Sequence, residues 1–206
     1  MTNNIKLQEV CKQLHIPIVG TTSWPLPREA REILRESNPC PFTAADLEER
    51  LIGTSEFMPR SAIVCLFPYH VPHEGPTNLS RYTWATDYHL VVADYLQRLV
   101  AELKTTAPDA SFSIHCDTSP LADRYMAYLA GLGFYGKNKC FINPTWGSYI
   151  VIGTVLTTLE FESNTPIADT CMGCNRCITS CLGQCLDGNA FNYATCKSYL
   201  TQKKGD

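Results

Sequence analysis

The stretch SAIVCLF at residues 61–67 is apolar at every position after its first, and Pro68 follows it directly. A short, continuous apolar run that stops at a proline is typical of a strand covered on both faces. The stretch FSIHC at residues 112–116 also suits a strand, and residues 17–20 suit a short strand that ends in a turn. We therefore expect residues 61–67 to form a buried strand of a sheet.

Helical spacing of apolar residues fills the segments between these strands. Residues 4–15 and 87–104 place their apolar side chains on one face, and Pro27 suits the first turn of another helix. A short helical piece is expected at residues 44–51. The Ser-Pro pair that opens residues 119–131 has the form of a cap followed by a proline, which predicts a helix over that range.

The remaining elements set the fold class. Residues 139–143 and 148–157 suit the two strands of a hairpin. Because helices alternate with strands and a hairpin comes late, we expect an α+β fold, an α/β sandwich, over residues 1–160. Residues 160–169 are polar and suit a linker. Residues 170–206 are expected to form a separate small module.

Composition narrows the class of protein. The chain has 206 residues, of which 45% are hydrophobic and 18% charged, as in ordinary globular proteins. It contains no apolar run of 18 residues and does not begin like a signal peptide, so we expect a cytoplasmic protein without a membrane helix. A net charge of -3 argues against strong nonspecific nucleic-acid binding, although a local patch could contact a folded RNA.

The cysteines carry the most specific signal. Six of the eleven lie between residues 171 and 196, and close spacing in a cytosolic chain usually indicates metal binding. Cys171, Cys174, Cys177 and Cys181 have the spacing C-x2-C-x2-C-x3-C, which is that of the bacterial ferredoxin run. Two-residue gaps allow successive thiolates to reach different irons of a 4Fe–4S cluster. Zinc is the main alternative, but it usually takes cysteine pairs that are far apart.

The fourth ligand of this cluster stays open. Ferredoxin runs normally have a proline after the fourth cysteine, whereas Leu182 follows Cys181 and Cys185 comes soon after. The fourth cysteine of such a run usually serves a second cluster. Either Cys181 or Cys185 could complete the first cluster if no second one forms, so the spacing predicts one or two clusters.

Several motifs resemble those of the epoxyqueuosine reductase family. They are SRYTWATDYH at 80–89, DTSPLADR at 117–124, GLGFYGKN at 131–138, INPTWGS at 142–148, the cysteine run, and CKSYLT at 196–201. The resemblance covers about residues 60–203. Family members continue past the last motif to a second cysteine run, so the resemblance implies a C-terminally shortened chain with an incomplete ferredoxin-like module.

The resemblance also implies a function. Members of this family are cobalamin-dependent reductases that convert epoxyqueuosine to queuosine at the wobble position of tRNA, with two 4Fe–4S clusters. Their catalytic domain is similar to flavin nitroreductases and cobalamin-processing proteins. The expected cofactors are therefore a 4Fe–4S cluster and cobalamin. The expected partners are the anticodon loop of tRNA, contacted transiently, and an external electron donor such as ferredoxin or flavodoxin.

The resemblance assigns site residues as well. Asp117 matches the proposed catalytic acid of the family, although an aspartate at this place could simply cap the helix expected from Ser119. Metal ligands are expected at Cys171, Cys174, Cys177, Cys181 and Cys196. Residues expected to bind the corrin or the substrate are Arg81, Tyr82, Asp87, Tyr88, His89, Gly133, Gly136, Lys137 and Asn138.

Alternative interpretations apply to two of these assignments and to one neighbouring pair of residues. His89 is expected to be a hydrogen-bonded wall residue rather than a cobalt ligand. Asp123 and Arg124 are expected to form a surface charge pair. The G-x-G-x-x-G pattern of residues 131–136 follows a helix rather than a strand, so we expect a helix cap followed by close approach to a large ligand, not a dinucleotide site.

Two other functions fit the same features. A reductive dehalogenase would share the cofactor pair, although many such proteins carry an export signal. An iron–sulfur or corrinoid-binding electron-transfer protein without turnover would also fit a chain that lacks the second cysteine run.

Overall fold

The computed structural model describes residues 3–36, 40–42, 49–50, 56–72, 75, 78–168, 171–187 and 191–203. The expected helix at 44–51 lies outside this part of the chain except for residues 49–50. The elements, in chain order, are α1 (Asn3–Gln13), β1 (Ile18–Ser23), α2 (Arg28–Glu36), β2 (Ser61–Pro68), η1 (Arg81–Trp84), α4 (Tyr88–Thr106), β3 (Phe112–Cys116), α5 (Asp123–Leu129), β4 (Phe134–Tyr135), β5 (Phe141–Ile142), β6 (Ile150–Thr157), α6 (Arg176–Thr179), η2 (Tyr193–Thr195) and α7 (Lys197–Leu200).

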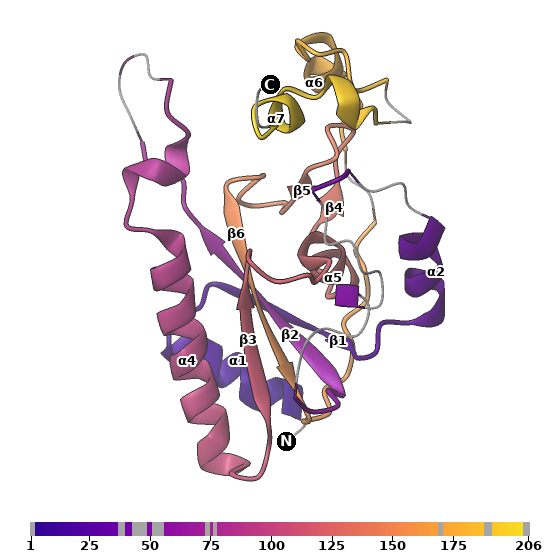
Figure 1. The fold of residues 1–206 in the computed structure, drawn as a ribbon. Helices are drawn as coiled ribbons and strands as arrows, with labels where there is room; N and C mark the ends of the chain where they lie inside the picture. Colours follow the sequence, from indigo (N-terminus) through magenta and orange to yellow (C-terminus); the bar gives the residue numbers. More distant parts are fainter. Residues whose placement is uncertain are drawn as a thin grey trace.

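A four-stranded sheet in the order β1-β2-β6-β3 forms the centre of the molecule, and every neighbouring pair is antiparallel (Figure 1). The predicted strand at residues 61–67 is confirmed as β2, which is buried along its length except at Pro68. Because its neighbours occupy both edges and helices cover both faces, an all-apolar sequence is what this position requires.

The expected hairpin of residues 139–143 and 148–157 is wrong in its pairing. β5 pairs with β4 in a separate two-stranded sheet, whereas β6 pairs with β2 and β3. The apolar run of β6 is buried only when it lies between those two strands. A tight turn at residues 143–147 still connects the two sheets, closed by a bridge between Asn143 and Gly147.

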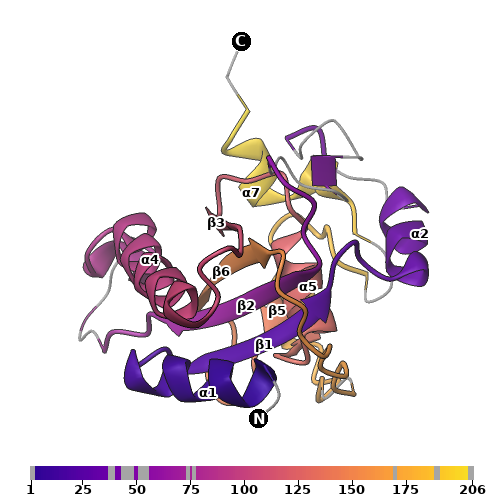
Figure 2. The ribbon, with the colours of Figure 1, turned by 90° about the horizontal axis from the view of Figure 1, so that it is seen from below.

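The residues of β2 alternate between two hydrophobic cores. Ile63, Cys65 and Phe67 face α1 and α4, while Ala62, Val64 and Leu66 face α5 and α2. Figures 1 and 2 show α1 and α4 on one face of the sheet and α5 on the other. Each fully buried aliphatic side chain contributes about 1.5–3 kcal/mol, so this three-layer body is stabilised mainly by apolar burial.

The starts of the two central helices differ from each other. α4 begins where expected, because the side chain of Asp87 accepts a hydrogen bond from the amide of His89. The helix expected from Ser119 begins only at Asp123, after Ala122, and has no side-chain cap. The hydroxyl of Ser119 instead accepts a hydrogen bond from the Leu121 amide, two residues on. Residues 117–122 therefore form a loop.

The segment at residues 160–165, which we call the strap, is not a free linker. The amide of Phe161 donates to Ser61 at 2.9 Å, and the Phe161 side chain is only 5% exposed. The amide of Thr21 donates to the Asn164 side chain at 2.7 Å. The strap is thus held along β1 and at the start of β2.

The cysteine-rich segment, residues 171–203, lies beside β4 and β5, at the end of the molecule away from the N-terminus (Figure 1). Its helices α6, η2 and α7 have four residues or fewer. Among its described residues, only Cys185 is buried. Within the described parts of the whole chain, no helix has the length and apolar character needed to cross a membrane.

Candidate functional site

A cavity of about 1270 Å³ opens between the loop that follows β3, the first turn of α5 and the start of β6. It exceeds the ~300–1,000 Å³ of most small-molecule sites, so it suits a large ligand. Its wall includes aromatic residues from distant parts of the chain. These are Phe42, Tyr69, Tyr82, Tyr88, Tyr125 and Tyr135.

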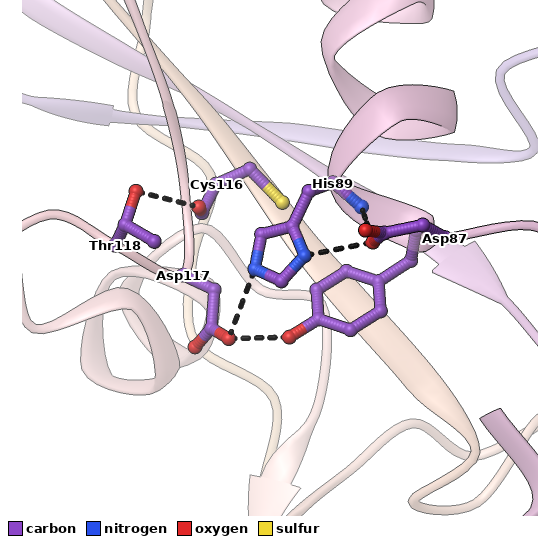
Figure 3. Close-up of polar contacts among 6 residues, drawn as sticks. Asp87, His89, Cys116, Asp117 and Thr118 are labelled. Carbon is purple, nitrogen blue, oxygen red and sulfur yellow. Dashed lines mark hydrogen bonds and ion pairs between the residues drawn. The ribbon is translucent and has the colours of Figure 1, made fainter. Parts of the chain in front are cut away.

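The acid predicted at residue 117 lies in a cluster at this cavity. The Tyr88 hydroxyl donates to Oδ2 of Asp117 at 2.5 Å, and Nε2 of His89 lies 3.6 Å from the same oxygen. Nδ1 of His89 is 2.8 Å from Oδ1 of Asp87. Figure 3 shows the imidazole of His89 between the two carboxyl groups. A phenol, an imidazole and two carboxyl groups are therefore linked in one network.

The backbone explains why Asp117 points into the network. Asp117 has φ 60°, in the left-handed region where aspartate is enriched among non-glycine residues. The amide of Thr118 donates to the Cys116 carbonyl at 2.7 Å, so the chain turns sharply as β3 ends. The alternative that Asp117 caps the following helix is wrong, because α5 begins six residues later.

The network keeps its protons in defined places. Burial, followed by the hydrogen bond to Asp117, raises the pKa of Tyr88 well above its ordinary value, so this phenol stays protonated. Hydrogen bonds from the backbone and side chain of His89 lower the pKa of Asp87. Burial and the nearby carboxylates raise the pKa of Cys116 to about 11, so its thiol is neutral.

Asp123 and Arg124 do not form the expected surface charge pair. Asp123 is half-buried in the cavity wall, and its Oδ1 lies 3.5 Å from Oγ1 of Thr154. Burial, followed by the charge of Asp117, raises its pKa to about 7. Arg124 donates from Nη1 to the carbonyl of Lys139 at 3.2 Å. Between them the two side chains form no ion pair in the described structure.

Only some of the other predicted binding residues reach the cavity. Tyr82 and Tyr88 line it, and Asp87 and His89 stand beside them in the network. Arg81 donates to the carbonyl of Val71 at 2.7 Å, and its guanidinium lies 6.0 Å from the ring centre of Tyr149.

The glycine-rich stretch is not part of the cavity wall. Gly131 has φ 70° and ends α5, as expected of a cap. A Cβ on Gly133 would lie 2.4 Å from the Ile142 carbonyl, so the close approach there is to β5 and not to an open ligand space. Lys137 donates to the side chain of Asn175 at 2.9 Å, and the side chain of Asn138 accepts from the Cys140 amide.

Sequence reasoning missed several residues of the cavity wall. Arg50, Tyr69, Tyr125, Tyr135 and Lys139 line it together with the predicted residues. They come from segments that are far apart in the chain, and no local motif marks them. Only the fold brings them together.

The cysteine-rich segment offers thiols in two groups. Sγ of Cys181 lies 3.3 Å from Sγ of Cys185, and the Cys185 thiol also interacts with Cys196. Burial and these bonds raise the pKa of Cys185 to about 11, while the hydrogen bond from Cys185 lowers the pKa of Cys181. Cys171, Cys174 and Cys177 form no disulfide in the described structure, and they are partly or fully exposed.

The donor chemistry of this segment fits an iron–sulfur cluster, because thiolates are the ligands that such clusters take. In the residues described here, no three histidine, cysteine or acidic side chains already converge as a metal site.

Comparison with known proteins adds sequence relatives. The family model described as "Epoxyqueuosine reductase QueG, DUF1730" matches residues 55–118. The epoxyqueuosine reductase of Bacillus cereus is 40% identical over 126 residues, which are 61% of this chain and 33% of the relative. That of Staphylococcus aureus is 38% identical over 127 residues, again 61% and 33%. The chain thus spans about a third of the length of these curated relatives.

Solved structures of epoxyqueuosine reductases are similar to this chain in fold. The epoxyqueuosine reductase of Streptococcus thermophilus superposes with a TM-score of 0.85 at 28% identity, covering 100% of this chain and 59% of that one. A crystal structure of epoxyqueuosine reductase with an epoxyqueuosine-modified tRNA-Tyr stem loop gives 0.83 at 27% identity, covering 98% and 58%. The Bacillus subtilis enzyme, with its catalytic aspartate loop swung out of the active site, gives 0.81 at 27%, covering 98% and 57%. Over the part of their length that it spans, the chain is therefore similar to the epoxyqueuosine reductases in both sequence and fold.

Proposed function

We propose that this chain carries the reductive site of an epoxyqueuosine reductase, which converts epoxyqueuosine to queuosine at the wobble position of tRNA. The observation that carries this proposal is the network of Asp117, Tyr88 and His89 at the edge of a large cavity. The aspartate loop and the tRNA stem loop named for the related structures support it.

The network suits the proton chemistry of this reaction. Breaking the first carbon–oxygen bond of an epoxide leaves an alkoxide-like oxygen, which needs a positioned proton donor. The Tyr88 phenol is protonated and held by Asp117, so the two side chains together present a proton at the cavity. His89, fixed through Nδ1 by Asp87, adds a second polar contact to Asp117.

The fold would hold two cofactors in this proposal. The size of the cavity and its aromatic wall, including Tyr82 and Tyr88, fit a corrinoid, and Cys171, Cys174, Cys177, Cys181 and Cys196 fit iron–sulfur ligands. When bound, cobalamin would supply a nucleophilic low-valent cobalt and a 4Fe–4S cluster would supply single electrons to it. An external donor such as ferredoxin or flavodoxin would provide these electrons, and the anticodon loop of tRNA would provide the substrate.

The test is anaerobic reconstitution with iron, sulfide and cobalamin, followed by conversion of an epoxyqueuosine-modified tRNA stem loop. We expect turnover that Asp117→Asn lowers about 10²–10⁴-fold, the range of a positioned acid. Asp109→Asn is the matched control, because Asp109 is an exposed turn residue after α4. A corrin spectrum without turnover would instead favour a corrinoid-binding electron-transfer protein. Absence of corrin binding would contradict the proposal and the dehalogenase alternative alike.

A further inference from the structure

We propose that Asp123 is a second proton-donating carboxyl group of this site, which supplies one of the two protons that the reaction consumes. This inference rests on the proposed function, and it extends the site beyond the Asp117 network. Sequence reasoning expected a surface residue here, whereas the structure places Asp123 at the first turn of α5, in the wall of the same cavity.

Asp123 lies outside the network of Asp117, Tyr88 and His89, but it lines the same cavity. Asp117 lies in the loop after β3 and is held by Tyr88 from α4, whereas the neighbour of Asp123 is Thr154 of β6. At 3.5 Å the contact with Thr154 is long, so the Asp123 carboxyl is weakly held and able to turn toward a ligand. The substrate could therefore meet two separate acids.

The charges around Asp123 favour its neutral form. The titratable groups that act on it are Asp117 from the β3 loop, Cys116 at the end of β3, and Arg124 from its own helix. Asp117 repels a second negative charge and Cys116 keeps its proton, so neither stabilises a carboxylate. The hydrogen bond from Thr154 and the charge of Arg124 lower the pKa of Asp123, but they are smaller causes, and the Arg124 guanidinium donates to the Lys139 carbonyl and forms no ion pair with Asp123 in the described structure. Burial acts in the same direction as Asp117, and the resulting pKa of about 7 allows Asp123 to hold a proton near neutral pH.

The stoichiometry of the reaction requires a second proton at this site. An epoxide that accepts two electrons and two protons loses its oxygen as water and leaves a carbon–carbon double bond. Both carbon–oxygen bonds break, and both protons end on the departing oxygen. The two electrons come from a low-potential one-electron donor of the ferredoxin or flavodoxin class. The Asp117–Tyr88 pair shares one proton, so the second needs another donor on the same cavity.

The first measurement needs neither cofactor nor turnover. Infrared difference spectra of the unloaded chain across pH 5 to 9 should show a protonated carboxyl band that disappears near pH 7. Asp123→Asn should remove this band. Asp94→Asn should leave it in place, because Asp94 is an exposed carboxylate 3.5 Å from Arg98 on the outside of α4. A spectrum in which Asp123 titrates near pH 4 would overturn the inference whatever the chain catalyses.

The second measurement uses the reconstituted protein. We expect Asp123→Asn to lower turnover about 10²-fold, in the range of general acid catalysis, and to remove the loss of rate above pH 7. Asp123→Glu should restore both, because it keeps the acid. Full activity and an unchanged pH profile in Asp123→Asn would overturn the donor role while leaving the proposed function standing. Lack of turnover in the unmodified protein, with the infrared band present, would contradict the proposed function and with it the donor role.

Discussion

The sheet body and the cysteine-rich segment are stabilised in different ways. β2 is buried along seven consecutive residues, between two cores supplied by α1, α4, α5 and α2. In the described part of residues 171–203, the only buried side chain is that of Cys185. A body of this kind folds without a ligand, whereas a small segment without an apolar core needs a metal or a similar support. We therefore expect the stability of the cysteine-rich segment to depend on what its thiols bind.

Loss of iron should therefore produce the largest difference between the two regions. We expect the chelator-treated protein to be cut by protease within residues 171–203 at least ~10-fold faster than the reconstituted protein, because metal binding and folding are coupled in such segments. The thermal midpoint of the body should stay nearly constant. Cys174→Ser should mimic chelation and Cys40→Ser should not. Equal protease resistance with and without iron would contradict the comparison.

Truncation of apolar side chains should give the next largest difference between the two regions, in the free energy of unfolding. Leu96 of α4 is fully buried, so Leu96→Ala should lower the free energy of unfolding by about 2–5 kcal/mol. Leu200 of α7 is 50% exposed, so Leu200→Ala should change it by less than about 0.5 kcal/mol. Urea unfolding of the reconstituted protein measures both. A cost for Leu200→Ala similar to that for Leu96→Ala would reveal a core in the segment.

The body should also show its own pH dependence through Asp123. Its folded pKa of about 7 exceeds the ordinary value of ~3.9, so the unfolded chain loses this proton first as pH rises. The stabilisation is present below about pH 4 and is lost progressively between pH 4 and 7. The upper limit is about 4 kcal/mol at about 1.4 kcal/mol per pH unit, and half-burial should reduce it. Asp123→Asn should flatten this part of the stability profile, while Asp109→Asn should not.

The smallest effect is expected where the two regions touch. Lys137→Ala removes the hydrogen bond to Asn175, and for an exposed surface contact the cost should stay below about 1 kcal/mol. Hydrogen exchange at the amides of residues 171–187 should become faster, while exchange in β2 should not change. Lys104→Ala, at an exposed position of α4, is the control. Faster exchange throughout the body would mean that this contact supports more than the segment.

The sequence was sufficient wherever local pattern determines structure. β2 and α4 followed from an apolar run and from helical spacing. The pairing of β6 did not, because the choice of partner strand depends on residues far away in the chain. The late start of α5 was missed because the Ser119 hydroxyl bonds within its own loop instead of capping a helix.

The residues of the candidate site also differ in whether a local motif marks them. Asp117 could be proposed from a motif, since the residues around it are contiguous in the chain. The raised pKa of Asp123 could not be predicted, because it arises from burial and from the charge of Asp117, against the opposing hydrogen bond from Thr154, which is 31 residues away in sequence. Tyr69, Tyr125 and Tyr135 of the cavity wall carry no local signal, and only the fold brings them together with Tyr82 and Tyr88.

The strap has a consequence for electron delivery. The strap is held to Thr21 through the side chain of Asn164. The next residue, Thr165, packs closely on Gly131, because a Cβ added at residue 131 would lie 2.6 Å from the Thr165 carbonyl. Cys171 follows Asn164 by seven residues. At about 3.3–3.6 Å per residue, Cys171 can therefore lie at most roughly 25 Å from Asn164. The thiols therefore stay at a high effective concentration beside the body, even when the segment is not docked. Electron delivery would be an intramolecular event, independent of protein concentration.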